Sequence, residues 1–171
     1  MIGKCYWITG LSATGKTTLS TLLVKELRAS GKQIIHFDGD DLRKAFSEKN
    51  YNRKDRVALG MRYAKLCNLL CNQGIDVVIA VIGLYKELHH WNRKNIINYV
   101  EIFIDTPLQE LIKRDPKGLY KAHLSGELPN IAGMDLKVDF PENPDIHIKW
   151  KDGKSVQSMY DELIKKINLN N

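Results

Sequence analysis

Residues 10–17, GLSATGKT, constrain this chain most, because they fit G-x-x-x-x-G-K-[ST] at every fixed position. Residues 5–8 before them form an apolar run that predicts a buried strand, and residues 17–27 after them predict a helix with leucines on one side. A chance match to the four fixed positions has a probability of roughly 1% in a chain of this length. The order of strand, glycine-rich loop and helix therefore predicts a phosphate cradle for ATP or GTP.

Each fixed position of this loop has a physical task. Gly10 and Gly15 allow the tight turn that points successive backbone N–H groups inward. We expect Lys16 to reach the β- and γ-phosphates and the Thr17 hydroxyl to bind Mg²⁺. These roles predict ATP with Mg²⁺ at this end of the chain.

The remaining periodicity predicts one α/β domain over residues 1–171, in three layers around a mostly parallel sheet. Residues 33–37 form a short strand after the first helix, which predicts a parallel pair with the strand at 5–8. The continuous aliphatic run at 76–82 predicts a central parallel strand. Further strands are expected at 99–105 and 145–150. Helices are expected at 42–46, 54–72, 88–96, 107–113 and from Ser155 onward.

An acidic turn, Asp38-Gly39-Asp40-Asp41, follows the second expected strand. Ligands bind outside the carboxyl ends of parallel strands, so we expect these carboxylates to face the phosphate loop. A helix cap is the alternative, with Asp40 or Asp41 accepting from N–H groups of the helix at 42–46. Three carboxylates are more than capping needs, and the turn therefore predicts catalytic or metal-binding carboxylates.

Residues 115–144 predict a mobile lid, since glycines and prolines interrupt every long period there. Arg114, Lys117 and Lys121 supply positive charge for nucleotide phosphates. The residues expected to bind ATP are Gly10, Leu11, Ser12, Ala13, Thr14, Gly15, Lys16, Thr17, Thr18 and Arg114.

Composition restricts the other classes of function. The net charge of +6 would suit a nucleic-acid-binding module, but no run of five or more like charges occurs, and a polyanionic small substrate explains the balance equally well. Three cysteines predict free thiols or core residues. The histidines show no metal-ligand spacing, so we expect no metal site other than the one for Mg²⁺. Neither a signal peptide nor a membrane-spanning run is found, which predicts a cytoplasmic protein without membrane or nucleic-acid partners.

A P-loop GTPase switch is a further alternative. Residues 115–118 match D-x-x-G, but they fall late in the chain and no N-K-x-D follows to read guanine. This absence favours a kinase over a GTPase.

Taken together, these motifs resemble the adenylylsulfate kinase family over nearly the whole chain. The family form GLSGSGKTT appears at 10–18 with Ala13-Thr14 in its middle, and DGDxxR appears at 38–43. The forms DTPLExxxxRDxKGLYKxAxxGE and PENP appear at 105–127 and 141–144. The resemblance implies transfer of the ATP γ-phosphoryl group to the ribose 3′-hydroxyl of adenylylsulfate, often in a homodimer. It also implies that Asp40 orients or deprotonates that hydroxyl while Asp38 and Thr17 hold Mg²⁺, and an exchange of roles between Asp38 and Asp40 is the alternative.

The departures from the family fall where the second nucleotide is expected. Leu59, Gly83, Lys86 and Ile131 stand in place of the family's asparagine, serine, arginine and phenylalanine, whereas Tyr51 keeps an aromatic ring. We therefore expect a different nucleotide anhydride as substrate, with cytidine diphosphoramidate preferred and adenylylsulfate as the alternative. Tyr51 and Ile131 would form a slot for its base. The residues expected to bind this nucleotide are Asp40, Arg43, Tyr51, Arg56, Leu59, Ile82, Gly83, Lys121 and Ile131.

Overall fold

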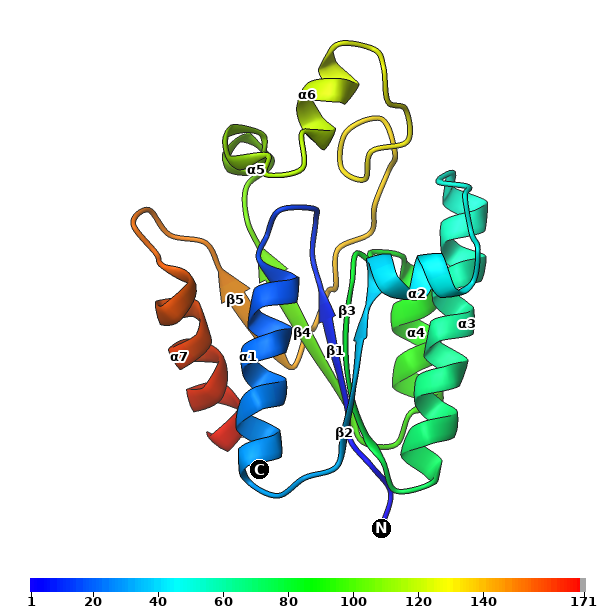
Figure 1. Cartoon of the computed structure of the whole chain (residues 1–171), viewed down its shortest axis with the longest axis vertical. Helices are drawn as coiled ribbons and strands as arrows, with labels where there is room; N and C mark the ends of the chain where they lie inside the picture. The colour runs from blue at the N-terminus through cyan, green and yellow to red at the C-terminus, as the bar shows by residue number, and fades with distance from the viewer. Residues whose placement is uncertain (170–171) are drawn as a thin grey trace.

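The computed structural model describes residues 1–169, which form a sheet covered by helices on both faces (Figure 1). The strands are β1 (Cys5–Thr9), β2 (Ile34–Asp38), β3 (Asp76–Val81), β4 (Tyr99–Asp105) and β5 (Ile146–Lys149). The helices are α1 (Lys16–Ala29), α2 (Gly39–Ala45), α3 (Arg53–Asn72), α4 (Lys86–Asn95), α5 (Leu108–Arg114), α6 (Leu119–Leu124) and α7 (Val156–Leu169). The expected α/β class is confirmed.

The strands follow the order β2-β3-β1-β4-β5, and every pairing between them is parallel. The continuous apolar sequence of β3 predicted a central position, and β3 does lie between two neighbours. The expected pairing of β1 with β2 is wrong, because β3 is inserted between them. A strand that is apolar on both faces gains most from burial in the middle of a sheet, whereas β2, with polar residues, lies at the edge.

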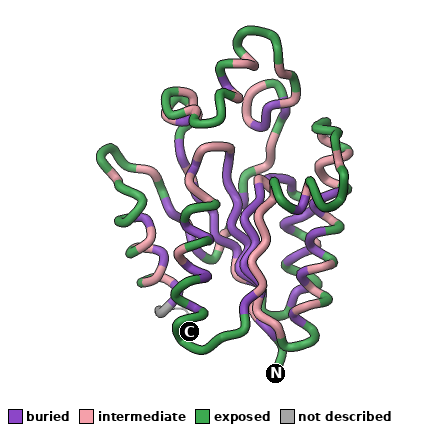
Figure 2. Tube along the Cα trace, viewed as in Figure 1, coloured by how far each residue is buried: buried purple, intermediate pink, exposed green. Residues whose placement is uncertain are grey.

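Side chains alternate between two apolar layers, as the strand period requires. Tyr6 and Ile8 of β1 pack on the face covered by α1 and α7, and Cys5 and Trp7 pack on the face covered by α3. Figure 2 shows the inner strands β1, β3 and β4 buried along most of their length and β2 at intermediate burial, with exposed residues on the outer sides of the helices. The phosphate loop therefore follows a strand that is fixed on both faces.

A third apolar cluster lies beneath the expected lid and connects it to the phosphate loop. Tyr120 and Ile131 from the lid pack there with Leu11 of the loop and Leu84, which follows β3. Residues 115–144 also contain the helix α6, which the broken periodicity did not predict. Buried anchors make the lid a packed segment in this structure, and its mobility stays a prediction.

The ends of two helices show how local the capping signals are. The side chain of Asp38 caps α2 by accepting from the Asp40 N–H at 2.9 Å, so the expected cap at Asp40 or Asp41 is wrong by two or three residues. Helix α2 begins at Gly39 for this reason. The cap of the last helix is confirmed, since Ser155 Oγ accepts from the Ser158 N–H at 3.1 Å.

Candidate active site

The phosphate loop leaves β1 at Thr9 and enters α1 at Lys16. Gly15 has a φ of +91°, a left-handed conformation that glycine adopts without steric cost. Ala13 also has a positive φ, +65°, at a position where the family form has glycine. A left-handed alanine is strained, and such strain persists only where the surrounding structure holds it, as at functional loops.

Lys16 lies inside the curve of the loop. Its ammonium donates to the Leu11 carbonyl oxygen at 2.6 Å and to Thr14 Oγ1 at 3.4 Å. Burial and, to a smaller extent, the positive charge of Lys117 lower the pKa of Lys16 to about 8, although the charges of Asp38 and Asp40 oppose the shift. A buried ammonium with neutral partners is well placed to meet a polyanion, which would restore a full counter-charge.

Thr17 and Asp38 bring two oxygen donors together at the start of α1 and the end of β2. Thr17 Oγ1 donates to Asp38 Oδ2 at 2.7 Å, and both residues line an open cavity. A hydroxyl and a carboxylate are hard ligands of the kind that Mg²⁺ uses when phosphates complete its coordination. No cluster of three or more acidic, histidine or cysteine side chains suited to a metal is found in residues 1–169. The pair therefore fits Mg²⁺ held jointly with a nucleotide.

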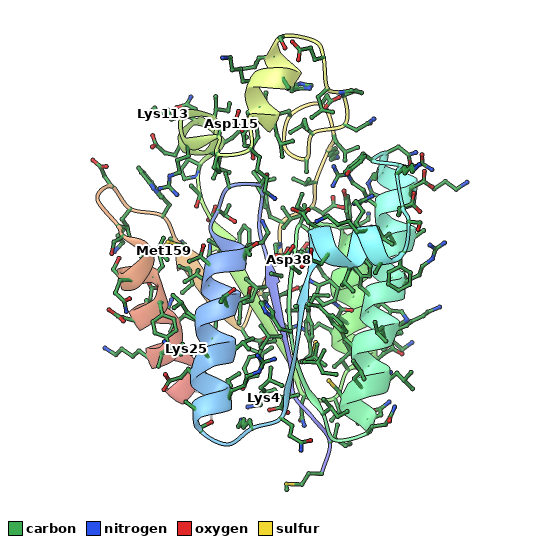
Figure 3. The ribbon with its side chains drawn as sticks, in the orientation of Figure 1. Lys4, Lys25, Asp38, Lys113, Asp115 and Met159 are labelled. Atoms are coloured by element: carbon green, nitrogen blue, oxygen red, sulfur yellow. The ribbon has the colours of Figure 1, made fainter. Side chains whose placement is uncertain are left out.

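Asp40 faces the lid across the same cavity. Its Oδ2 accepts a hydrogen bond from the ammonium of Lys117, which lies in the turn before α6. This hydrogen bond holds the pKa of the Asp40 carboxyl below its usual value, and the same contact raises the pKa of Lys117. Figure 3 labels Asp38 at the carboxyl edge of the sheet and Asp115 at the start of the lid, two residues before Lys117. The acidic turn therefore faces the phosphate loop through Asp38, as expected, and it also contacts the lid through Asp40, which was not predicted.

The cavity between these elements has a volume of about 510 Å³. Sequence reasoning placed Thr17, Asp38 and Asp40 there and named Lys117 only as a charge of the lid. It missed His36, whose Nε2 lies 2.9 Å from Ser20 Oγ, because a lone histidine in a strand carries no pattern. The lining residues are Thr17, Thr21, His36, Asp38, Asp40, Asp41, Lys44 and Lys117.

Two arginines gather on the exposed ring of Tyr51. The guanidinium carbon of Arg43 lies 4.3 Å from the ring centroid and that of Arg56 lies 5.1 Å from it. Arg56 also donates to the carbonyl oxygens of Tyr51 and Asn130, at 2.7 and 3.0 Å, and Arg43 donates to that of Asn50 at 2.8 Å. Among the described residues, neither guanidinium forms an ion pair. The arrangement offers two cations without a counter-ion to an anionic ligand.

Other residues expected near the second nucleotide belong to the apolar interior. Leu59 is 2% exposed in the cluster around Trp7, and Ile131 is buried in the cluster beneath the lid. Of the two residues expected to form the base slot, Tyr51 is exposed and Ile131 is buried, so an open slot between them is not formed in this structure. The carbonyl oxygen of Ile82 accepts from Thr9 Oγ1.

Gly83 is a glycine for steric reasons. Its φ is +51°, and an added Cβ would lie 3.0 Å from Val81 Cγ2 and 3.1 Å from Trp7 Nε1. The family's serine would therefore be strained here. The neighbouring departure, Lys86, has an exposed side chain, and only its backbone N–H bonds to Asp139, at 3.3 Å.

Three further expected residues lie at the surface. Thr18 is exposed on α1, Arg114 is exposed at the end of α5, and Lys121 is exposed on α6. The backbone N–H of Lys121 donates to Asp115 Oδ2 at 2.9 Å, which leaves its ammonium available to a ligand. None of the three lines the cavity at the acidic turn.

Known proteins resemble this chain in sequence and in fold. A sequence model described as adenylylsulphate kinase matches residues 2–149. The chain belongs to the adenylylsulphate kinase family. It is 36% identical to the cytidine diphosphoramidate kinase of Campylobacter jejuni over 95% of both chains. It is 37% identical to the adenylyl-sulfate kinase of Deinococcus deserti over 98% of this chain and 93% of that one.

The solved structures show the same relationship. The APS kinase CysC of Mycobacterium tuberculosis, in complex with AMPPNP and APS, superposes with a TM-score of 0.88 at 31% identity and covers 98% of both chains. Family membership makes this chain a phosphotransferase with a hydroxyl group as acceptor. In the part of the chain that the structure describes, no helix combines the length and the apolar character that crossing a membrane requires.

Proposed function

We propose that this kinase transfers the γ-phosphoryl group of Mg·ATP to the ribose 3′-hydroxyl of cytidine diphosphoramidate. The observation that carries the proposal is the cavity that the Thr17–Asp38 pair and the Asp40–Lys117 pair both line. The charges of Asp38, Asp40 and Lys117 also act on Lys16 of the phosphate loop. Phosphoryl transfer to a hydroxyl requires a base, ligands for Mg²⁺ and positive charge close to one another. Here Asp40 is the base, Thr17 and Asp38 are the Mg²⁺ ligands, and Lys16 and Lys117 supply the positive charge.

In this mechanism, Lys16 and the loop N–H groups bind the phosphates, and the positive charge of Lys16 stabilises the negative charge that grows on the transferred group. Asp40 orients the 3′-hydroxyl and accepts its proton, while Thr17 and Asp38 would hold Mg²⁺. Bound Mg²⁺ would supply charge neutralisation at the phosphate oxygens. Lys117 keeps Asp40 ionised in the free enzyme and closes the site against water from the lid side.

The choice of the receiving nucleotide depends on the substituted positions, because the two named relatives are almost equally identical. Leu59 and Ile131 are packed in apolar clusters. Leu59 lacks the side-chain amide of the family's asparagine, and Ile131 lacks the aromatic ring of the family's phenylalanine. Each lost polar partner weakens a ligand that needs it by about 1–3 kcal/mol. A pyrimidine needs less stacking area than adenine, which supports the cytidine compound over adenylylsulfate.

The first prediction tests this choice. Wild-type enzyme should show a higher kcat/KM for cytidine diphosphoramidate than for adenylylsulfate at equal Mg·ATP, by several-fold or more. Lys86→Arg is the variant of choice for restoring adenylylsulfate use, because the Lys86 side chain is exposed and tolerates exchange. Leu59→Asn, Gly83→Ser and Ile131→Phe change packed or strained sites and would confound stability with specificity.

Adenylylsulfate used at least as well as the cytidine compound would contradict the proposed substrate and favour sulfate activation. Ordinary nucleoside diphosphates serve as the control for unspecific phosphorylation.

Two further proposals concern the domain organisation and the oligomeric state. We infer from the family resemblance that residues 1–171 act as one kinase domain and that two copies form a homodimer, which sedimentation at several concentrations tests.

A further inference from the structure

Arg53, the first residue of α3, lies where three segments of the chain meet. Its guanidinium donates to both carboxylate oxygens of Glu87 on α4, at 2.8 and 3.1 Å, and to Asp139 Oδ2 at 2.9 Å. The guanidinium carbon also lies 5.2 Å from the centroid of the Tyr85 ring, and Tyr85 is 2% exposed. A buried ring against the guanidinium and two carboxylates bonded to it fix the orientation of the Arg53 side chain.

Asp139 extends this network to the segment that returns from the lid. Its Oδ2 also accepts from the backbone N–H of Lys86, at the start of α4, at 3.3 Å. Its own N–H donates to the Leu84 carbonyl oxygen at 2.9 Å. One carboxylate therefore joins the first turns of α3 and α4 to a segment that lies 86 residues from Arg53 in the sequence.

A second arginine of α3 holds the other end of the same segment. Arg56 donates to the Asn130 carbonyl oxygen at 3.0 Å. Residues 130–139 form a folded loop, in which the Asp135 carboxylate accepts from the first two backbone N–H groups at 2.8 and 2.7 Å. Because Arg53 and Arg56 are three residues apart on a helix, they lie on the same side of it. The first turn of α3 therefore holds the loop 130–139 at both ends.

This loop adjoins the place where the receiving nucleotide is expected rather than the place of ATP. Ile131 belongs to the loop, and Tyr51 immediately precedes the cap of α3. The expected ATP and Mg²⁺ ligands lie instead on the phosphate loop and at the end of β2. A change in the position of the loop 130–139 should therefore alter binding of the receiving nucleotide and leave binding of ATP as it is.

We propose that Arg53 is a positioning residue for the receiving nucleotide, which acts by holding Asp139, and with it the loop 130–139, on the first turn of α3. The inference rests on the proposed function, since it takes a nucleotide to be the phosphate acceptor. Arginine suits this role because its planar guanidinium bonds two carboxylates at once, whereas a lysine ammonium lacks that geometry.

The first test compares the kinetics of Arg53→Met with those of wild type, because methionine keeps an unbranched side chain and removes the guanidinium. We expect the KM for the receiving nucleotide to rise about 3- to 30-fold, the usual effect of a change in a network coupled to a site. The kcat and the KM for ATP should stay within about twofold of wild type. Initial rates with cytidine diphosphoramidate and with adenylylsulfate measure these values, and Arg53→Lys should give an intermediate KM.

Two partner variants separate the lid contact from the contact with α4. Asp139→Ala should raise the same KM as Arg53→Met does, and the double variant should raise it no further, because both changes remove one contact. Glu87→Gln is the matched control. It weakens the connection between α3 and α4 but keeps the bond from Arg53 to Asp139, so its KM should equal that of wild type.

Hydrogen exchange of the ligand-free proteins provides a measurement that needs no nucleotide. Peptides from residues 130–139 should exchange faster in Arg53→Met and in Asp139→Ala than in wild type, because the loop loses its attachment to α3. The same peptides should exchange in Glu87→Gln as in wild type. Peptides from β3 serve as the internal reference.

Several results would overturn the role of Arg53 alone. These are an unchanged KM for the receiving nucleotide in Arg53→Met, a rise of both KM values together, and a Glu87→Gln effect as large as that of Asp139→Ala. Unchanged exchange of residues 130–139 in Arg53→Met would overturn it as well. A wild type that phosphorylates neither nucleotide would overturn the proposed function, and the inference with it, even where exchange shows that Arg53 holds the loop.

Discussion

Two lysines act on the acidic turn from opposite sides, and their environments differ. Lys16 is enclosed by the phosphate loop and has neutral partners, so its pKa is lowered to about 8. Lys117 is half exposed and is paired with Asp40, so its pKa is raised. Of the two ammonium groups, only that of Lys16 therefore loses its proton in the moderately alkaline range.

We predict a basic limb in the pH profile of the enzyme. The kcat/KM for ATP reports the free enzyme, and it should fall as pH rises through about 8, because Lys16 loses the positive charge that attracts phosphate. Lys117→Met should move this limb to higher pH, since the charge of Lys117 lowers the pKa of Lys16. The measurement is initial rate at subsaturating ATP across the range.

Lys113→Met is the control for this prediction, because Lys113 is exposed on α5 and its ion pair within residues 1–169 is with Glu110. In Lys113→Met, the fall of kcat/KM with rising pH should coincide with that of wild type. A profile that stays flat well above pH 8 would show that Lys16 is not the titrating group.

Asp40 and Asp38 have different partners, which separates their expected roles. Asp38 contacts the Thr17 hydroxyl and caps α2, whereas Asp40 faces the lid. We predict that Asp40→Asn lowers kcat by about 10²- to 10⁴-fold with little change in ATP affinity, the usual effect of losing a positioned base. Single-turnover transfer and ATP titration on the same preparation measure both. Loss of ATP binding would instead identify Asp40 as a metal ligand.

At the scale of the elements, the lid and the phosphate loop are joined by a short series of contacts. The Tyr120 hydroxyl donates to the Ser12 carbonyl oxygen at 3.1 Å, and Asp115 accepts from the N–H groups of Tyr120 and Lys121. These bonds fix the turn that carries Lys117. We therefore expect the lid to respond to ligands that bind the loop.

We predict that residues 115–144 become more protected from hydrogen exchange when Mg·ATP and the receiving nucleotide are bound, because closure adds contacts to Lys117 and Lys121. Tyr120→Phe should exchange faster than wild type in the free enzyme, since it loses the bond to Ser12. Peptides from α7, on the far side of α1, provide the internal control. Equal protection with and without ligands would make the segment a static loop.

At the scale of the whole molecule, binding at the loop should stabilise the fold by mass action. ATP at 100 times its Kd adds about 2.7 kcal/mol, which corresponds to a rise in Tm of about 5–11 °C for a chain of this size. We predict this shift for wild type with Mg·ATP and its near absence in Lys16→Ala, whose far-ultraviolet circular dichroism should match wild type. Lys16→Ala should also lose catalytic turnover. An equal shift in both proteins would remove Lys16 from nucleotide binding.

The sequence by itself determined the local features of this protein. The phosphate loop, the buried character of β3 and the cap of α7 each depend on residues within one or two turns of chain, and their patterns show in the sequence. The position of the acidic turn after the second strand likewise predicted that its carboxylates face the phosphate loop, and Asp38 does contact Thr17. These predictions agree with the structure because glycine conformation, apolar periodicity and capping are short-range effects.

Only the tertiary structure decided which of these features meet. The insertion of β3 between β1 and β2, the contact of Thr17 with Asp38 and the contact of Lys117 with Asp40 join segments that are far apart in sequence. The hydroxyl of Tyr85 is left unpaired for the same reason, since its surroundings come from α3 and the lid return. Packing of the whole sheet fixes such contacts, because each strand takes the place that buries the most apolar surface.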